Sequence, residues 1–160
     1  MNVDRSRLRF LAEGVVFAVT LSMGRRVSAQ AGPNGRITVY QEPTCGCCNK
    51  WVVHLQRSGF AAVVENRADL QPIKRQYQVP ADVEACHTAV IEGYVIEGHV
   101  PADVIGRLLR ERPKIVGLAV PGMPAGSPGM EAPGSPGEPY RVFMFDKGRT
   151  VGVFATRASG

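Results

Sequence analysis

The sequence predicts an α/β domain in which strands and helices alternate around a cluster of cysteines. The run Arg36–Gln41 alternates apolar and polar residues, as a half-buried strand does. The run Asn49–Arg57 has the apolar spacing of an amphipathic helix, and three of the four cysteines precede it, in the segment Cys45-Gly46-Cys47-Cys48. Because Pro43 breaks the strand just before the first cysteine, we expect the thiols in a strand-to-helix turn, at or near a helix N-terminus.

A helix N-terminus is a favourable place for thiolates. Its unpaired backbone N–H groups and the helix dipole stabilise negative charge, so we expect thiol pKa values to fall there. Clustered thiols of low pKa either exchange disulfides or bind soft metals, and this segment alone allows both kinds of chemistry.

The remaining chain continues the alternation and adds a long loop. The expected elements are a strand at Phe60–Val64, a helix at Ala68–Gln78, a hairpin of Thr88–Ile91 and Tyr94–Glu97, a helix from Pro101 to before Pro113, and a second hairpin of Arg141–Phe145 and Thr150–Phe154. Between residues 117 and 139, glycine and proline occupy 12 of 23 positions, which predicts a long Gly/Pro/Met loop carrying Met123 and Met130. The order strand, helix, strand, helix, hairpin, helix is typical of a thioredoxin-like domain, to whose sheet edge the C-terminal β-hairpin is added.

Residues 1–31 are predicted to be an export signal, separate from the folded domain of residues 32–160. Three arginines within residues 5–9 give a basic start, and Phe10–Met23 is mostly apolar but too short for a permanent membrane span. The triplet Ala29-Gln30-Ala31 has the small-x-small pattern of a cleavage site. We therefore expect a periplasmic protein cleaved near Ala31; the alternative is an uncleaved helix that tethers the chain to a membrane.

The net charge gives no reason to expect a nucleic-acid partner. Of the formal +5, residues 1–31 contribute +3, from five arginines and two acidic residues, and the rest of the chain carries +2, from 14 basic and 12 acidic residues. A mature domain of charge +2 without a run of basic residues lacks the electrostatic footprint of nucleic-acid binding.

Export would place the cysteines in an oxidising compartment, where an even number of them usually indicates structural disulfides. The spacing fits such a framework badly. Cys47 and Cys48 are neighbours and pair only with strain, whereas a Cys45–Cys48 pair would leave Cys47 and the distant Cys86 without a stapling pattern. A redox or metal site is therefore favoured over a structural framework.

Cys86 and His87 are expected to face the cysteine turn from across the site. They precede the first hairpin, at about the place where a thioredoxin-like fold has a cis-proline opposite its dithiol. Three or four convergent thiolates exceed what disulfide exchange needs, whereas thiolate and thioether ligands suit Cu(I), with Zn(II) next. The sequence thus favours a soft-metal site.

Histidine and methionine side chains could complete this site or serve structural roles. His87 is either a nitrogen ligand or a core imidazole, and Met123 and Met130 are either thioether ligands or residues that pack the loop. His99 precedes a helix start, where bonding to the backbone is favoured over contact with the site. His54 is expected at the surface of the first helix.

Motifs spread over nearly the whole mature chain point to a known family. They are Thr38-Val-Tyr40, Pro43-Thr-Cys-Gly-Cys-Cys48, Trp51, Val79-Pro80, Cys86-His-Thr-Ala-Val90, Gly93-Tyr-Val-Ile-Glu-Gly-His-Val-Pro101, Gly117-Leu-Ala-Val-Pro-Gly-Met-Pro124 and Gly126-Ser-Pro-Gly-Met130. Together these motifs resemble the CopG-type family, also catalogued as a domain of unknown function (four-one-one), and the resemblance runs from about Ile37 to Phe154.

The resemblance implies an exported bacterial protein with a variant thioredoxin-like fold and an association with copper resistance. Carried over by position, it implies metal ligands at Cys45, Cys47, Cys48 and Cys86. Adjacent cysteines cannot easily all bind one ion, so several Cu(I) ions could share bridging sulfurs, with zinc the less favoured metal. The expected partners are copper ions and a copper efflux or copper-carrier protein.

We expect a metal-binding protein rather than an enzyme, with redox activity on copper or disulfides left open. The alternatives are a thiol-disulfide oxidoreductase of thioredoxin type and, more weakly, an iron–sulfur electron carrier, whose cysteines usually lie further apart.

Overall fold

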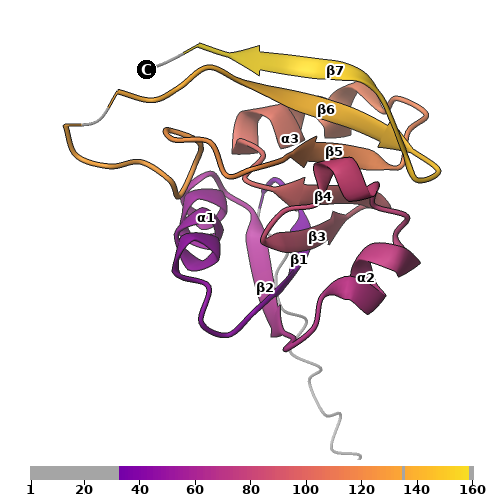
Figure 1. Cartoon of the computed structure of the whole chain (residues 1–160), viewed down its shortest axis with the longest axis horizontal. Coiled ribbons are helices and arrows are strands. Elements are labelled where there is room, and N and C mark those ends of the chain that lie inside the picture. Colours follow the sequence, from indigo (N-terminus) through magenta and orange to yellow (C-terminus); the bar gives the residue numbers. More distant parts are fainter. Residues whose placement is uncertain (1–32, 135, 159–160) are drawn as a thin grey trace, which may run out of the picture.

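The computed structural model describes residues 33–134 and 136–158, which form a mixed α/β domain with a seven-stranded sheet and three α-helices (Figure 1). In chain order the elements are β1 (Arg36–Gln41), α1 (Gly46–Arg57), β2 (Ala61–Asn66), α2 (Gln71–Gln76), a 3-10 turn (Ala81–Val83), β3 (His87–Ile91), β4 (Tyr94–Gly98), α3 (Ala102–Glu111), β5 (Gly117–Val120), β6 (Tyr140–Asp146) and β7 (Arg149–Arg157). The predicted export signal lies outside the described residues. Within the described part of the chain, no helix has the length and apolar character needed to cross a membrane.

The strands are ordered β2-β1-β3-β4-β5-β6-β7 across the sheet. β1 runs parallel to β2 and antiparallel to β3, and β3 and β4 are antiparallel neighbours joined through Glu92 and Gly93. β5 is parallel to β4, and β6 and β7 extend the sheet as an antiparallel pair beyond β5. Because β1 pairs with β3, the start of β3 lies beside the end of β1, from which the chain passes into α1.

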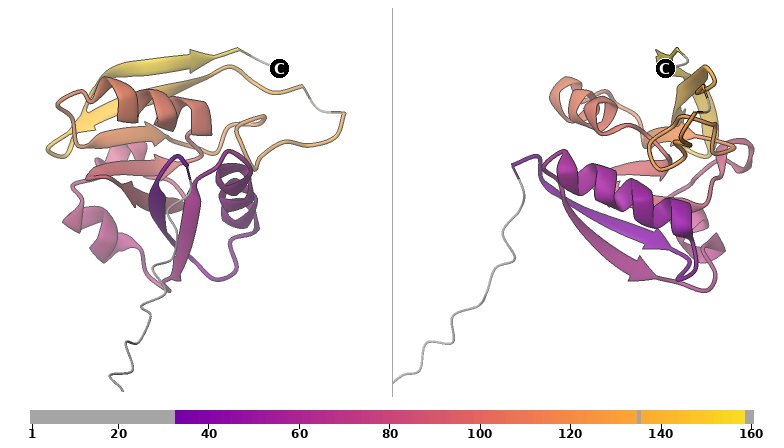
Figure 2. Two further views of the ribbon diagram at one scale, coloured as in Figure 1. Left: turned by 180° about the vertical axis from the view of Figure 1, so that it is seen from behind. Right: turned by 90° about the vertical axis from the view of Figure 1, so that its left-hand side faces the viewer.

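Alternation along the strands divides the apolar core between the two faces of the sheet. Trp51 of α1 and Leu108 of α3 belong to one buried cluster together with Ile96 of β4. The neighbouring Val95 belongs to a second cluster, with Val83 from the 3-10 turn after α2. Because neighbouring residues of a strand point to opposite faces, α1 and α3 cover one face, and the segment after α2 covers the other (Figure 2).

α1 starts at Gly46, three residues before the start of the predicted helix, with Cys45 as its N-cap. Burial of Trp51 and Leu55 on one face explains why this amphipathic run is helical. The chain leaves the helix at Gly59, whose φ of +85° is a conformation that glycine adopts easily. The two cysteines after Gly46 therefore lie in the first helical turn.

The prediction that residues 117–139 are all loop is wrong, because Gly117–Val120 forms β5 inside the sheet. Four residues are too few for an alternating pattern to be recognised against the glycines and prolines that follow. Gly117 suits this position, since a Cβ there would meet the Val95 backbone and the Phe145 ring. The loop therefore starts at Pro121 and ends before β6.

Other boundaries differ less. The strands predicted at Phe60–Val64, Arg141–Phe145 and Thr150–Phe154 start or end one to three residues away from β2, β6 and β7. The helix predicted at Ala68–Gln78 is shorter, because α2 spans only Gln71–Gln76. Asp69 accepts a hydrogen bond from the Gln71 N–H in the turn before α2, and Gln78, with φ of +55°, lies beyond its end.

Candidate metal centre

Three cysteines enter the site from the start of α1. Cys45 is the N-cap, and Cys47 and Cys48 lie in the first turn. The Cys45 N–H donates a hydrogen bond to the carbonyl of Glu42, and the Cys45 carbonyl accepts one from the Asn49 N–H. Cys45 and Cys47 are half-buried and Cys48 is fully buried, so two of the three residues keep some exposure to solvent.

Cys45 and Cys48 are joined by a disulfide, whereas Cys47 and Cys86 are free thiols. This disulfide is the small redox ring that the spacing of the cysteines allows. The Cys47 sulfur lies 3.5 Å from the Cys45 sulfur, so a thiol touches the disulfide directly. Reduction of the disulfide would turn both of its sulfurs into thiols at the same place.

Cys86 faces these sulfurs from the opposite wall. It directly precedes β3, whose first residue, His87, pairs with Gln41 at the end of β1. Because the chain runs from Gln41 into the cysteine turn, this register brings Cys86 to the start of α1. The Cys86 carbonyl oxygen lies 3.8 Å from the Cys48 sulfur, and the sulfurs of all four cysteines lie within 4.8 Å of one another.

Two buried histidines lie behind Cys86. Its sulfur is 3.3 Å from Nδ1 of His87 and 3.2 Å from Nε2 of His99. The His87 ring packs between Trp51 and His99, with ring centroids 4.3 Å and 5.1 Å apart. His99, for which the sequence favours backbone bonding alone, therefore also contacts the site, and this expectation is corrected.

The loop after β5 fixes the position of the proton on the His99 ring. Nδ1 of His99 lies 2.7 Å from the carbonyl oxygen of Pro128, which can only accept, so Nδ1 carries the hydrogen. Burial lowers the pKa of His99 and of His87, which favours neutral rings at pH 7. Nε2 of His99 therefore presents a lone pair to the Cys86 thiol, or to a metal ion that replaces the thiol proton.

Cys86 lies before β3 and outside the helix turn for which low thiol pKa values are expected, and its own pKa is set mainly by burial. Burial raises the pKa of Cys86 to about 12, and the neighbouring Cys47 adds to the rise. The metal-free protein therefore holds Cys86 as a neutral thiol at pH 7. A metal ion that binds the Cys86 sulfur must release this proton.

The loop after β5 closes a third side of the site, beside the start of α1 (Figure 2). Met123 places its sulfur 3.9 Å from the Cys47 sulfur, although the Met123 side chain is 37% exposed. Met130 is half-buried, and its backbone closes the loop through hydrogen bonds with Ser127 and Gly126. Of the two predicted methionines, Met123 is the one that contacts a cysteine of the site.

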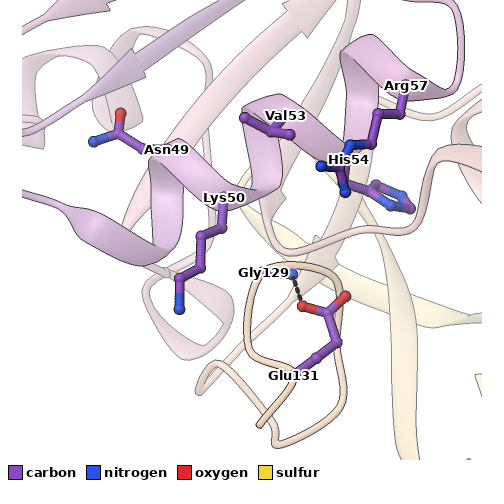
Figure 3. Close-up of a pocket in the computed structure, with 7 residues that line it drawn as sticks. All are labelled: Asn49, Lys50, Val53, His54, Arg57, Gly129 and Glu131. Carbon is purple, nitrogen blue, oxygen red and sulfur yellow. Dashed lines mark hydrogen bonds between the residues drawn. The ribbon is translucent and has the colours of Figure 1, made fainter. Parts of the chain in front are cut away.

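A hollow of about 450 Å³ runs along α1 beside the loop, and no cysteine lines it (Figure 3). His54 lines this hollow, and its Nε2 accepts a hydrogen bond from the Ala102 N–H at the start of α3. His54 therefore lies half-buried in a surface hollow and also binds the start of α3. Across the hollow, Glu131 accepts a hydrogen bond from the Gly129 N–H within the loop (Figure 3).

One part of the site escapes sequence reasoning: a buried ion pair between Lys74 of α2 and Glu97 of β4. Glu97 gives a weak signal, because a carboxylate that ends the apolar run Tyr94-Val-Ile in a strand needs a buried partner. Nothing in the sequence identifies Lys74 as that partner, since a lysine in a short polar helix is ordinarily exposed.

Comparisons with known proteins give one family and two similar solved structures. Residues 83–130 match the family described as proteins of unknown function, DUF411. A structure of the copper resistance protein CopG, form 1, is 42% identical, covers 77% of this chain and 97% of its own, and has a TM-score of 0.71. Form 2 of CopG is 40% identical, covers 80% of this chain and 99% of its own, and also has a TM-score of 0.71. A comparison with curated protein sequences gave no match.

Proposed function

This chain belongs to the CopG family of copper resistance proteins, and on that basis we propose that it is a periplasmic protein that binds Cu(I) through cysteine thiolates. Its role would lie in copper homeostasis. It would hold copper, pass it to a copper efflux or copper-carrier protein, or change its oxidation state. Membership of the family suggests a role in copper resistance, and the cysteines of this chain are the reason for proposing that it binds Cu(I) itself.

The observation that carries the proposal is the convergence of four cysteine sulfurs, from Cys45, Cys47, Cys48 and Cys86, within 4.8 Å of one another. Thiolates and thioethers are soft ligands that suit Cu(I), and Zn(II) is the next candidate. Once the disulfide is reduced, adjacent thiolates cannot easily all bind one ion, so several Cu(I) ions would share bridging sulfurs. His87, His99, Met123 and Met130 are proposed as further ligands or as groups that orient the cysteines.

The fold supports a thioredoxin-like assignment, which we include in the proposal. The strand order β2-β1-β3-β4, with β1 parallel to β2 and antiparallel to β3, follows the succession of elements typical of that fold. In this assignment the cysteine turn at the start of α1 would take the place of the dithiol. β5 and the β6–β7 pair would then be additions beyond β4.

The periplasmic location rests on the sequence of residues 1–31, which would be removed to leave the domain of residues 32–160. Intact-mass measurement on protein from a periplasmic fraction tests this directly. A mature N-terminus at or near Gly32 is expected. A soluble cytoplasmic pool that retains residues 1–31 would contradict the proposed location.

A second function, thiol-disulfide exchange, is favoured by one specific observation, the disulfide between Cys45 and Cys48 at a helix N-terminus. In that case Cys86 would be a bystander, because two thiols are enough for the exchange. In the copper proposal Cys86 supplies a thiolate from the opposite wall. The role of Cys86 therefore separates the two functions.

The experiment compares the wild type with Cys86→Ser after anaerobic purification, measuring copper per chain, Cu(I) affinity by competition, and reduction of insulin. Serine keeps the size of the side chain but offers a hard oxygen that Cu(I) binds poorly. We expect the wild type to bind copper, and Cys86→Ser to fold but bind less copper or bind it more weakly. Unchanged copper binding, with strong insulin reduction by both proteins, would overturn the proposal in favour of thiol-disulfide exchange.

A further inference from the structure

The ion pair between Lys74 and Glu97 lies in the interior of the protein, next to the segment that carries Cys86. The side chains of Lys74 and Glu97 are 4% and 0% exposed, and Lys74 Nζ contacts Glu97 Oε1 directly. Thr88, the cross-strand neighbour of Glu97, donates its hydroxyl to Glu97 Oε2 at 2.7 Å and accepts a hydrogen bond from Lys74 at 3.2 Å. The three side chains form a closed network between α2, β3 and β4.

This network holds both backbone groups of Ala85, the residue before Cys86. The Ala85 N–H donates to Glu97 Oε1 at 2.6 Å, and Lys74 donates to the Ala85 carbonyl oxygen at 3.0 Å. The side chain of Ala85 packs closely against Gly98. So little space separates them that a Cβ placed on Gly98 would lie only 2.7 Å from the Ala85 Cβ. Ala85 is thus fixed through its N–H, its C=O and its side chain.

Stability alone is a weak reason for such a pair. Removing two charges from water costs free energy that their attraction often fails to recover, and an apolar pair of similar size is frequently as stable. A buried ion pair does, however, fix geometry, because each charge accepts few alternative partners in a dry environment. Here the geometry that it fixes is that of Ala85, and the next side chain is Cys86.

We propose that the Lys74–Glu97 ion pair is a positioning device that holds the Cys86 sulfur against the sulfurs of α1. The pair acts through the backbone of Ala85 and touches no sulfur itself. The inference deepens the proposed function, on which its consequence for copper rests, but the position of Cys86 can be tested without any metal.

The first test uses the full chain in its oxidised form, in which Cys47 and Cys86 are the free thiols. Dibromobimane, a short reagent that fluoresces strongly when it links two nearby thiols, reports how readily Cys47 and Cys86 meet. The test variant is Lys74→Met combined with Glu97→Leu, which removes both charges and leaves no unpaired ion. We expect it to link the two thiols several-fold more slowly than the wild type.

Three further variants make this result decisive. Glu65→Gln combined with Arg67→Gln removes an exposed ion pair, and Val142→Ala weakens the buried core at β6; neither should slow the linking. Thr88→Val keeps the shape of threonine, removes one hydroxyl from the network and should slow the linking to a smaller extent. It replaces the double variant if that protein does not fold.

The second test measures Cu(I) affinity by competition, together with thermal unfolding of the metal-free chains. Loss of a group that orients a metal ligand typically costs about 10- to 100-fold in affinity, and we expect this loss in the folded double variant. Linking and Cu(I) affinity both at wild-type values in the folded variant would overturn the positioning role. Equal slowing by Val142→Ala would also overturn it. A wild type that binds no copper, with linking slowed by the network variants and not by the two controls, would refute the proposed function but support the positioning role.

Discussion

The two walls of the cysteine site are built differently. The α1 wall places Cys45, Cys47 and Cys48 in one turn at a helix N-terminus, with two of the three residues half-buried. The β3 wall offers a single sulfur, Cys86, backed by buried histidines and by the Lys74–Glu97 network. The α1 wall can form a disulfide between two of its own cysteines, whereas the β3 wall, with one cysteine, cannot.

This difference divides the control of the site between two kinds of chemistry. On the α1 wall the oxidation state decides how many thiolates are available, because Cys45 and Cys48 are disulfide-bonded in the structure. On the β3 wall protonation decides whether Cys86 is available as a thiolate, because burial raises the pKa of Cys86 to about 12. A soft metal that bridges both walls needs the disulfide reduced and the Cys86 proton removed.

The largest expected effect comes from the oxidation state of the α1 wall. The reduced chain offers four thiols, whereas the oxidised chain offers only Cys47 and Cys86. We expect copper per chain, measured by elemental analysis after desalting, to fall sharply on oxidation. A chain with Cys45→Ser and Cys48→Ser cannot form this disulfide, so it should bind equally little copper under both conditions. Equal loading of the oxidised and reduced wild type would show that the α1 disulfide sulfurs are not ligands.

The next effect is a dependence of stability on pH, to which the β3 wall contributes together with His54 of α1, whose pKa burial also lowers. His87 and His99 have lowered pKa values in the folded protein, so below about pH 6.5 the unfolded chain takes up protons that the folded chain resists. The free energy of unfolding should fall there by about 1.4 kcal/mol per pH unit for each proton. Burial raises the pKa of Glu97, so the folded chain takes up this proton more readily than the unfolded chain does. At pH values near the ordinary pKa of a glutamate, this opposes the effect of the histidines, and the free energy of unfolding falls less steeply with falling pH.

At alkaline pH the free energy of unfolding should fall as the pH rises, the opposite of its change at acid pH. Cys86 has a raised pKa, so above about pH 9 the unfolded chain loses a proton that the folded chain keeps, and stability falls as the pH rises. Urea unfolding of the oxidised, metal-free chain between about pH 8 and pH 10 measures this loss. Cys86→Ser should lessen the alkaline decline in this range and leave the smaller part that comes from Tyr40 and Tyr140, whose pKa values burial also raises. A wild type and a variant with identical pH profiles would contradict the half-buried, protonated state of Cys86.

A smaller effect is expected from the loop that joins the two walls. A Cβ on Gly129 would lie 2.9 Å from the Cys47 carbonyl oxygen and 2.9 Å from the Trp51 backbone nitrogen, so Gly129→Ala should push the loop away from α1. We expect a loss of about 1–3 kcal/mol in the free energy of unfolding, measured with urea. Gly122→Ala is the matched control, since Gly122 also has a positive φ but has open space around its Cβ position. Equal losses of stability in the two variants would mean that the whole effect comes from the strain of a positive φ, and that the close approach of the loop to α1 contributes nothing.

The smallest effect concerns the methionines. Met123→Leu removes the thioether that lies 3.9 Å from the Cys47 sulfur, so Cu(I) affinity should weaken by a few-fold in competition measurements. Because leucine and methionine have similar volumes, the metal-free protein should lose less than about 1.5 kcal/mol of stability. Met130→Leu serves as the comparison and should leave the affinity nearer to that of the wild type. A loss of stability with unchanged affinity in Met123→Leu would assign Met123 a packing role.

The α1 wall was accessible to sequence reasoning, and the β3 wall only in part. The apolar spacing of the helix and the break at Pro43 place the cysteine turn, because both signals are local. The position of Cys86 depends on a register between β1 and β3 that the sequence does not state directly. The hairpin pattern nevertheless puts Cys86 just before a strand, and the expected thioredoxin-like fold has that position opposite its dithiol.

What could not be predicted depends on contacts between distant segments. Lys74 and Glu97 are 23 residues apart and pair only because α2 packs against the β3–β4 strands. β5 is short, and its place between β4 and β6 follows from tertiary pairing rather than from its own pattern. His54 caps α3 for the same reason, through a partner 48 residues away.

In the proposed copper site, Cu(I) is held by sulfurs from both walls at once. X-ray absorption spectroscopy at the copper edge of the reduced, Cu(I)-loaded chain identifies the atoms bound to copper, with Cys86→Ser measured alongside. We expect a coordination shell dominated by sulfur in the wild type and fewer sulfurs per copper ion in Cys86→Ser. A shell of nitrogen and oxygen alone in the wild type, or the same number of sulfurs in both proteins, would contradict it.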